Sequence, residues 1–179
     1  MLFRSVEVTV RRENTAYKQR YERGIPTHEL ESESDPSPET GTSLRFLPDT
    51  EIFTTGIEFD YNTLAGRLRE LAYLNAGVKI TFTDHRNPDQ PRRETYCYEG
   101  GIKEYVGYIV GEKQPLHPDI IYVQGEKEGV QVEVALQWCI DAYSDNVLGF
   151  ANNIRTVDGG THLEGLKTVL TRTMNNIAR

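Results

Sequence analysis

The sequence predicts a mixed fold, α/β or α+β, in which strands alternate with amphipathic helices. Three observations support this prediction. The valines of 6–10 alternate with polar residues, which is the period of a half-buried strand. The leucines of 64–71 recur at three- and four-residue steps, which is the period of one helix face. The last stretch, 146–179, joins a short apolar strand, a glycine turn and a second amphipathic helix.

The first part of the chain is predicted to be a hairpin followed by a loop and a strand. Residues 6–11 and 17–22 both alternate, and a short polar link joins them, so they are expected to pair. Residues 27–40 are acidic, rich in serine and proline and almost free of apolar side chains, which is typical of a mobile surface loop. Residues 43–47 form the next expected strand.

A helix is predicted over 61–76. Asp60 precedes it as a suitable N-cap, and Gly77 follows it at the position where glycine usually ends a helix. Arg67 and Glu70 lie off the leucine stripe, so both are expected to point to water.

Five further elements follow. A break at Gly100-Gly101 lies between the second and the third of them, and we take it as the domain boundary. The two strands around segment 125–129, which begins and ends with glycine, have the pattern of a hairpin. The predicted elements are strands 78–83 and 95–98, helix 102–112, and strands 120–124 and 130–140.

The C-terminal stretch begins with a strand at Val147 to Phe150 and a glycine turn at 158–160. Thr161 and Glu164 have the spacing of a capping box, which predicts that Thr161 caps the last helix. A helix N-terminus after glycines can bind an anion. Asp158 and Glu164 would repel a phosphate, so we prefer a structural turn. The expected apolar stripe is Leu163, Leu166, Leu170, Met174 and Ile177.

Composition narrows the class of protein. The 179 residues carry 20 basic and 27 acidic side chains, a net charge of -7, so any DNA contact has to come from a local basic patch. Two cysteines, Cys97 and Cys139, indicate a reducing compartment, which we take as the cytoplasm. No apolar run approaches eighteen residues, so no membrane span is expected. The four histidines have no zinc-like spacing, and no metal site is predicted.

Five blocks resemble one family in order and spacing. They are GTSLRFLPD, RLRELAYLNAGVKI, YEGGIKEYV, GVQVEVALQW and FANNIRTVDGGTHLEGLKTVLTRT. Each is similar to the DNA gyrase B family, whose close paralogue is the B subunit of topoisomerase IV. The resemblance implies that 1–100 is the C-terminal part of a GHKL (Bergerat) ATP-binding sandwich. It implies that 101–179 is the N-terminal part of a transducer domain of the ribosomal-S5-domain-2-like type.

The resemblance implies the B subunit of a type II DNA topoisomerase, which couples ATP binding and hydrolysis to DNA strand passage and supercoiling. Its cofactors would be ATP and Mg²⁺, and its partners the gyrase A subunit, DNA and a second B subunit. The family's catalytic and Mg²⁺-binding residues lie outside the matched blocks, and 1–5 matches nothing in the family. We therefore expect an internal fragment without catalytic residues, inactive in isolation. A non-catalytic binding module is the alternative.

The resemblance also assigns an edge of the adenine pocket to Gly41, Thr42 and Lys18. Glycine permits close approach, and the Thr42 hydroxyl is both donor and acceptor. On residue type alone, Gly41-Thr42 is more typical of a turn that opens a strand, and only the resemblance favours the adenine contact. Many family members have arginine where Lys18 stands, and lysine lacks the planar fork. Lys18 is otherwise an exposed hairpin charge.

Two basic residues of the last helix are candidates for a DNA contact. Lys167 matches a family position that lines the cavity for transported DNA, and Arg172 has weaker support of the same kind. Both also fit a solvated helix face. Asn152 and Asn153 are expected to satisfy the backbone at the end of the strand rather than bind a ligand.

Overall fold

The protein has two compact units, Met1–Phe59 and Asp60–Arg179. The structure is a computed structural model that describes residues 2–37, 39–142 and 144–179. Met1, and Pro38 of the predicted 27–40 loop, lie outside the described residues. None of the helices within the described ranges is long and apolar enough to cross a membrane.

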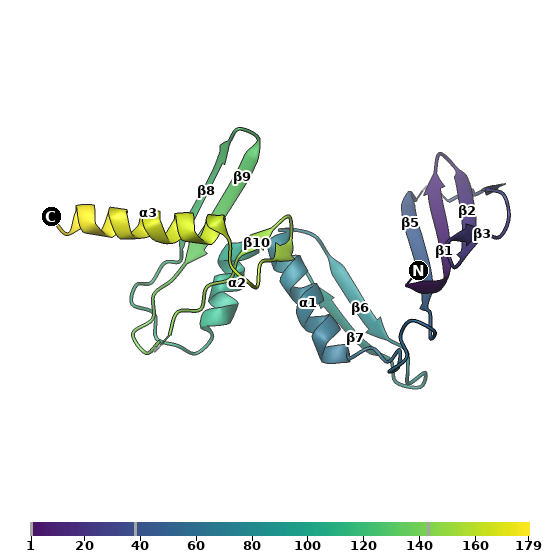
Figure 1. Ribbon diagram of the computed structural model, residues 1–179, viewed down its shortest axis with the longest axis horizontal. Coiled ribbons are helices and arrows are strands. Elements are labelled where there is room, and N and C mark those ends of the chain that lie inside the picture. The colour runs from purple at the N-terminus through teal and green to yellow at the C-terminus, as the bar shows by residue number, and fades with distance from the viewer. Residues whose placement is uncertain (1, 38, 143) are drawn as a thin grey trace. The chain divides into compact units, whose positions relative to one another are not determined.

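The first unit is one antiparallel sheet (Figure 1). Its strand order is β3-β2-β1-β5, and β4 also pairs with β2. The strands are β1 (Phe3–Arg12), β2 (Thr15–Glu22), β3 (Ile25–Pro26), β4 (Glu31–Ser34) and β5 (Gly41–Pro48).

The predicted hairpin is confirmed. Glu13 and Asn14 form its two-residue turn, with φ of 52° and 56°. Two positive φ angles are typical of the turn whose twist matches that of the flanking strands. The prediction of a structureless loop over 27–40 is wrong in part, because β4 lies within it and pairs with β2. β4 consists of four polar, exposed residues, so no apolar alternation marks it as a strand.

The sheet of the first unit has one apolar and one polar face. Directly paired residues of an antiparallel sheet lie on the same face. The register therefore shows on which face of the sheet each side chain lies. The apolar face carries Val6, Val8, Val10, Tyr17, Tyr21, Thr42, Leu44 and Phe46, together with one amide side chain, Gln19, opposite Val8. The polar face carries Glu7, Thr9, Lys18, Arg20, Ser43 and Arg45. Leu44 is 61% exposed and Phe46 44% exposed on the apolar face.

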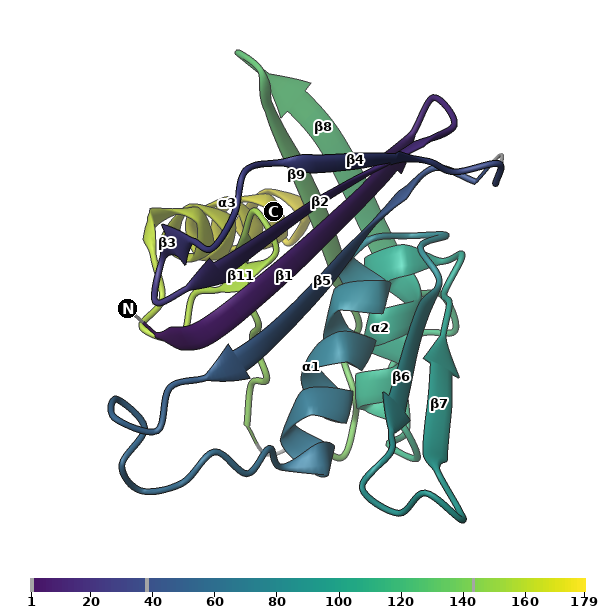
Figure 2. The ribbon, with the colours of Figure 1, turned by 90° about the vertical axis from the view of Figure 1, so that its right-hand side faces the viewer.

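The second unit contains three helices, two longer hairpins and one very short hairpin within the described residues. Figure 2 shows α1 beside the β6–β7 hairpin and α2. The elements are α1 (Tyr61–Leu74), β6 (Ile80–Asp84), β7 (Arg92–Tyr96), α2 (Gly101–Val110), β8 (Ile121–Lys127), β9 (Val130–Leu136), β10 (Phe150–Ala151), β11 (Ile154–Arg155) and α3 (Thr161–Ile177).

The start of α1 agrees with the prediction. The Asp60 side chain accepts a 2.7 Å hydrogen bond from the backbone N–H of Thr63, as an N-cap does. The helix ends at Leu74, with Asn75 as its C-cap. Gly77, predicted at C′, therefore lies one residue beyond the C′ position, with φ of 78°.

The prediction that Glu70 points to water is wrong. Glu70 is buried, and it accepts a 3.3 Å hydrogen bond from the Tyr105 hydroxyl of α2. Its other oxygen pairs with Arg67. The helix α1 contacts β6 and β7 as well as α2, so two sides of α1 are covered rather than one.

Tyrosines fill the space between α1 and α2. Tyr73 is buried and stacks on Tyr98 at 3.6 Å between ring centroids, and on Tyr105 at 4.8 Å. At the start of α2, a Cβ on Gly101 would lie 3.3 Å from the Ala76 Cβ. The break at Gly100-Gly101 therefore lies where α2 approaches the end of α1, and the domain boundary at this break stays a prediction.

The last helix, α3, forms as predicted, but its cap is different. The N-cap is Gly160, with no capping side chain, and Thr161 is the first helical residue. The His162 Nε2 lies 3.0 Å from Thr156 Oγ1, and Glu164 interacts with Lys167 instead of reaching back to the cap. The stripe of α3 is half-buried near its start, whereas Met174 and Ile177 are exposed. The strand predicted from Val147 is shorter and begins at Phe150.

Candidate functional site

Gly41 and Thr42 open strand β5. They pair with Arg11 and Val10 of β1, and both are exposed. A Cβ on Gly41 would meet no atom within 4 Å, and its φ is not positive. The glycine therefore leaves free surface beside Thr42. The Thr42 side chain shares the apolar face with Val10 and Leu44, so a hydroxyl stands at the edge of an apolar strip.

Lys18 lies on the opposite face of the same sheet. It pairs across the strands with Thr9, whose other neighbour is Ser43, whereas Thr42 pairs with Val10. The structure therefore does not bring the Lys18 and Thr42 side chains together on one face. The Lys18 ammonium forms an ion pair with Glu33 of β4.

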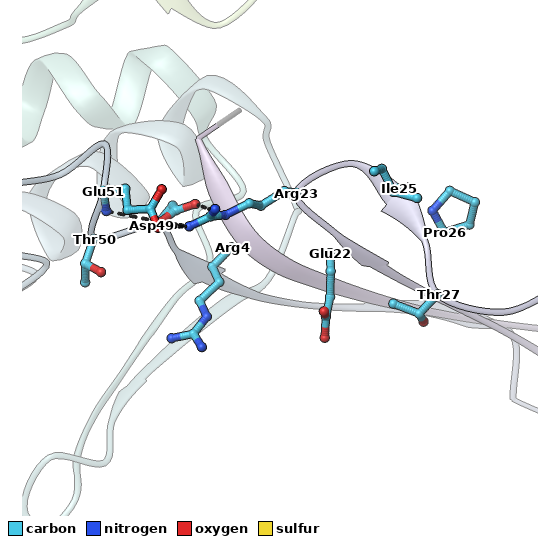
Figure 3. Close-up of a pocket in the computed structure, with 9 residues that line it drawn as sticks. All are labelled: Arg4, Glu22, Arg23, Ile25, Pro26, Thr27, Asp49, Thr50 and Glu51. Carbon is cyan, nitrogen blue, oxygen red and sulfur yellow. Dashed lines mark hydrogen bonds and ion pairs between the residues drawn. The ribbon is translucent and has the colours of Figure 1, made fainter.

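A cavity of the first unit lies at the other end of the sheet (Figure 3). It has a volume of about 790 Å³ and is lined by Arg4, Glu22, Arg23, Ile25, Pro26, Thr27, Asp49, Thr50 and Glu51. Gly41, Thr42 and Lys18 do not line it.

An ion-pair network lies at this end of the sheet. Arg23 Nε donates to Asp49 Oδ2 at 2.8 Å, and its guanidinium also pairs with Glu51. Asp49 is buried, and its pKa lies below the usual value. The main cause is the hydrogen bond from the backbone N–H of Glu51, followed by those from Arg23. Sequence reasoning missed this network, although Pro48-Asp49 marks the turn that positions it.

The structure also forms a polar cluster around Glu94 of β7, which the sequence did not predict. The Tyr96 hydroxyl donates to Glu94 Oε2 at 2.6 Å, and the Tyr61 hydroxyl donates to Oε1 at 2.8 Å. Arg92 donates to Oε1 at 3.1 Å, and Arg69 donates to Oε2 at 3.4 Å. The bonds from Tyr96, Tyr61 and Arg92, with that from Tyr96 the largest contribution, lower the pKa of Glu94 to about 2. Burial, followed by the bond to Glu94, raises the pKa of Tyr96 to about 12.

The two basic candidates on α3 are exposed but do not share a face. Lys167 Nζ lies 3.4 Å from Glu164 Oε1, one turn earlier. Arg172 makes no ion pair with any side chain that the structure describes. Five residues of an α-helix correspond to a rotation of about 140°, so Lys167 and Arg172 point in clearly different directions.

No group of three His, Cys, Asp or Glu side chains in residues 2–37, 39–142 and 144–179 is arranged to hold a metal ion. Cys97 and Cys139 are both free thiols.

Solved structures match nearly the whole chain. The 43K ATPase domain of Thermus thermophilus gyrase B, in complex with an aminocoumarin, aligns with a TM-score of 0.84 and 32% identity, over 99% of this chain and 47% of that one. The gyrase B structure from Myxococcus xanthus aligns with a TM-score of 0.86 and 27% identity, over 98% of this chain and 50% of that one. The fold is thus that of the ATPase region of gyrase-type B subunits.

Sequence comparisons give the family. The DNA gyrase B family model matches residues 101–179. The DNA gyrase B protein of Synechocystis sp. is 64% identical over 97% of this chain, and the chloroplastic/mitochondrial DNA gyrase B protein of Oryza sativa is 49% identical over 99%. The chain belongs to the DNA gyrase B family. It spans 16% and 25% of the lengths of these two relatives. Their names favour gyrase over topoisomerase IV.

Proposed function

We propose that this chain works as part of the B subunit of a DNA gyrase, a type II DNA topoisomerase that couples ATP binding and hydrolysis to strand passage and supercoiling. Alignment over nearly the whole chain carries the proposal. Nearly the entire chain, 99%, aligns with a gyrase B ATPase domain at a TM-score of 0.84, and 97% aligns at 64% identity with a gyrase B protein.

The proposed adenine contact is the Gly41-Thr42 edge of β5. Its chemistry fits a purine, because Thr42 offers a hydroxyl beside the apolar side chains of Val10 and Leu44. The open surface at Gly41 permits close approach of a flat ring. Lys18, on the opposite face, would act only at the margin of such a site. Mg²⁺, the second proposed cofactor, would be held by residues other than these.

The proposed partners are the gyrase A subunit, DNA and a second B subunit. Lys167 and Arg172 are the proposed DNA-facing charges of α3, and both side chains are exposed as this role requires. We further propose two domains, 1–100 from the ATP-binding sandwich and 101–179 from the transducer. The proposed compartment is the cytoplasm; the rice relative is named chloroplastic/mitochondrial.

A chimera tests the proposed function. Residues 6–179 replace the corresponding segment of the Synechocystis gyrase B protein, and the product is combined with the Synechocystis gyrase A protein. We expect ATP-dependent supercoiling of relaxed plasmid, absent with a non-hydrolysable ATP analogue. The unmodified Synechocystis gyrase B protein is the control. A folded chimera that neither hydrolyses ATP nor supercoils DNA would contradict the proposal.

A further inference from the structure

The turn between β10 and β11 consists of Asn152 and Asn153. Their φ values are 48° and 65°, a backbone conformation that asparagine tolerates better than other residues with a side chain. The two flanking strands are only two residues long each, Phe150–Ala151 and Ile154–Arg155. So short a hairpin is not stable by its own strand pairing, and its position depends on other contacts.

Two of those contacts join the turn to α1. Arg67 Nη2 donates to the Asn153 carbonyl at 2.6 Å, and Asn153 Nδ2 donates to Asn75 Oδ1 at 2.9 Å. The Asn75 amide is itself oriented, because its Nδ2 donates to the Leu71 carbonyl at 2.7 Å. The Asn75 oxygen therefore faces Asn153 as an acceptor. Asn153 was expected only to satisfy nearby backbone, and instead it makes a contact 78 residues away in the sequence.

Arg67 is held in place from the other side as well. It pairs with the buried carboxylate of Glu70, which accepts a hydrogen bond from Tyr105 of α2. A guanidinium fixed by a buried carboxylate loses less conformational freedom when it binds a second acceptor. The Arg67 contact with Asn153 therefore joins the turn to both α1 and α2.

The far side of the hairpin is joined to α3. The Thr156 N–H donates to the Gly149 carbonyl at 2.9 Å, and Thr156 Oγ1 lies 3.0 Å from His162 Nε2 in the first turn of α3. The fit is close, because a Cβ on Gly149 would lie 2.9 Å from that His162 nitrogen. The hairpin and the start of α3 are thus packed together with little free space.

We propose that Asn153 is a positioning residue that links α1 to α3, so that a movement of α1 is passed to the helix that carries Lys167 and Arg172. This inference rests on the proposed function, because it gives the link a role in coupling the nucleotide-binding part to the DNA-facing part. The contacts run from α1 through Asn153 to the β10–β11 hairpin, and from Thr156 to His162.

The link itself is tested by hydrogen exchange on the full chain. Asn153→Gly keeps the turn conformation and removes the amide, while Asn152→Gly is the matched control, since the Asn152 side chain makes no hydrogen bond within the described part of the chain. We expect Asn153→Gly to speed exchange in 150–156 and the first turn of α3 about fivefold relative to the control, the size of one hydrogen bond. Asn75→Ala removes the other partner of the same hydrogen bond. In the double variant, the increases in exchange rate caused by Asn153→Gly and Asn75→Ala should therefore not add. Full additivity, or equal exchange in the two glycine variants, would overturn the link.

The role in coupling is tested in the chimera, by the number of supercoils introduced per ATP hydrolysed. Asn153→Gly should lower this ratio about fivefold, the lower end of typical coupling factors, with ATP hydrolysis retained. Asn152→Gly should leave the ratio unchanged. An active chimera whose ratio is the same with both variants would refute the coupling role alone. Loss of supercoiling and hydrolysis in the unmutated chimera would instead refute the proposed function, and the exchange experiment would still decide on the link.

Discussion

Tyr96 and Glu94, two residues apart on the same strand, are joined by a 2.6 Å hydrogen bond from phenol to carboxylate. Alternate residues of a strand share a face, so β7 presents donor and acceptor to the same side. Tyr61 and Arg69, both from α1, bind the same carboxylate. This small cluster therefore fixes α1 on the β6–β7 hairpin.

The Glu94 cluster predicts a pH dependence of stability. The pKa of Glu94 is about 2 in the folded chain, below the usual 4.5, so the unfolded state binds the proton first as the pH falls. Stability from this group is present above about pH 4.5 and is lost as the pH falls towards 2. Thermal melts across this range should show a steeper loss for the parent chain than for Glu94→Gln. Glu112→Gln, at an exposed site, is the control and should leave the slope unchanged.

The burial of Glu70 predicts an effect that an exposed glutamate would not have. Glu70→Ala removes the acceptor of the Tyr105 hydroxyl and the partner of Arg67, and should lower the free energy of unfolding by about 1–3 kcal/mol. Glu70→Gln keeps a hydrogen-bond acceptor and should cost less. Urea unfolding measures both. If Glu70→Ala is neutral, the contact with Tyr105 makes no net contribution.

Replacing each of two glycines in the α3 region with alanine should change the stability of the chain in opposite directions. Gly160 has φ of 156°, and a Cβ there would lie 2.7 Å from the His162 ring, so Gly160→Ala should destabilise the chain by about 1–3 kcal/mol. Gly165 lies within the helix with no atom within 4 Å of its Cβ position. Gly165→Ala should stabilise by up to about 1 kcal/mol. Equal melting temperatures for the two variants would contradict this account.

The sheet register predicts which side chain of β5 affects nucleotide binding. In the chimera, Thr42→Val keeps the shape and removes the hydroxyl, and should weaken ATP binding roughly tenfold, the upper range for one hydrogen bond. Ser43→Ala, the next residue on the opposite face, should leave affinity unchanged. Equilibrium binding of a fluorescent ATP analogue measures both. If Ser43→Ala weakens binding more than Thr42→Val does, the nucleotide lies on the polar face.

Local patterns predicted most of the elements, because they depend on nearby residues. The first hairpin, the Asp60 cap and the three helices each follow from periodicity or a short motif, and the structure confirms them. The prediction of secondary structure failed where an element exists only because its backbone pairs with another strand. β4 has four polar residues, and only its backbone pairing with β2 makes it a strand.

The sites were harder to predict because they depend on contacts between distant segments. A helical pattern indicates one buried side of α1, but a second neighbour, α2, covers Glu70. Asn153 meets Arg67 and Asn75 only after folding, and the Glu94 cluster likewise needs α1 against β7. Gly41, Thr42 and Lys18 came from family resemblance, and the register adds that Lys18 stands on the other face.

The two-faced sheet of the first unit has a practical consequence. Leu44 and Phe46 stand in water beside a row of valines, while charged groups neutralise one another on the reverse side. An exposed apolar face of this kind binds other apolar surfaces. Purified 1–59 should therefore increase the fluorescence of environment-sensitive dyes and aggregate on warming, unless a second layer of protein covers the face that carries the valines.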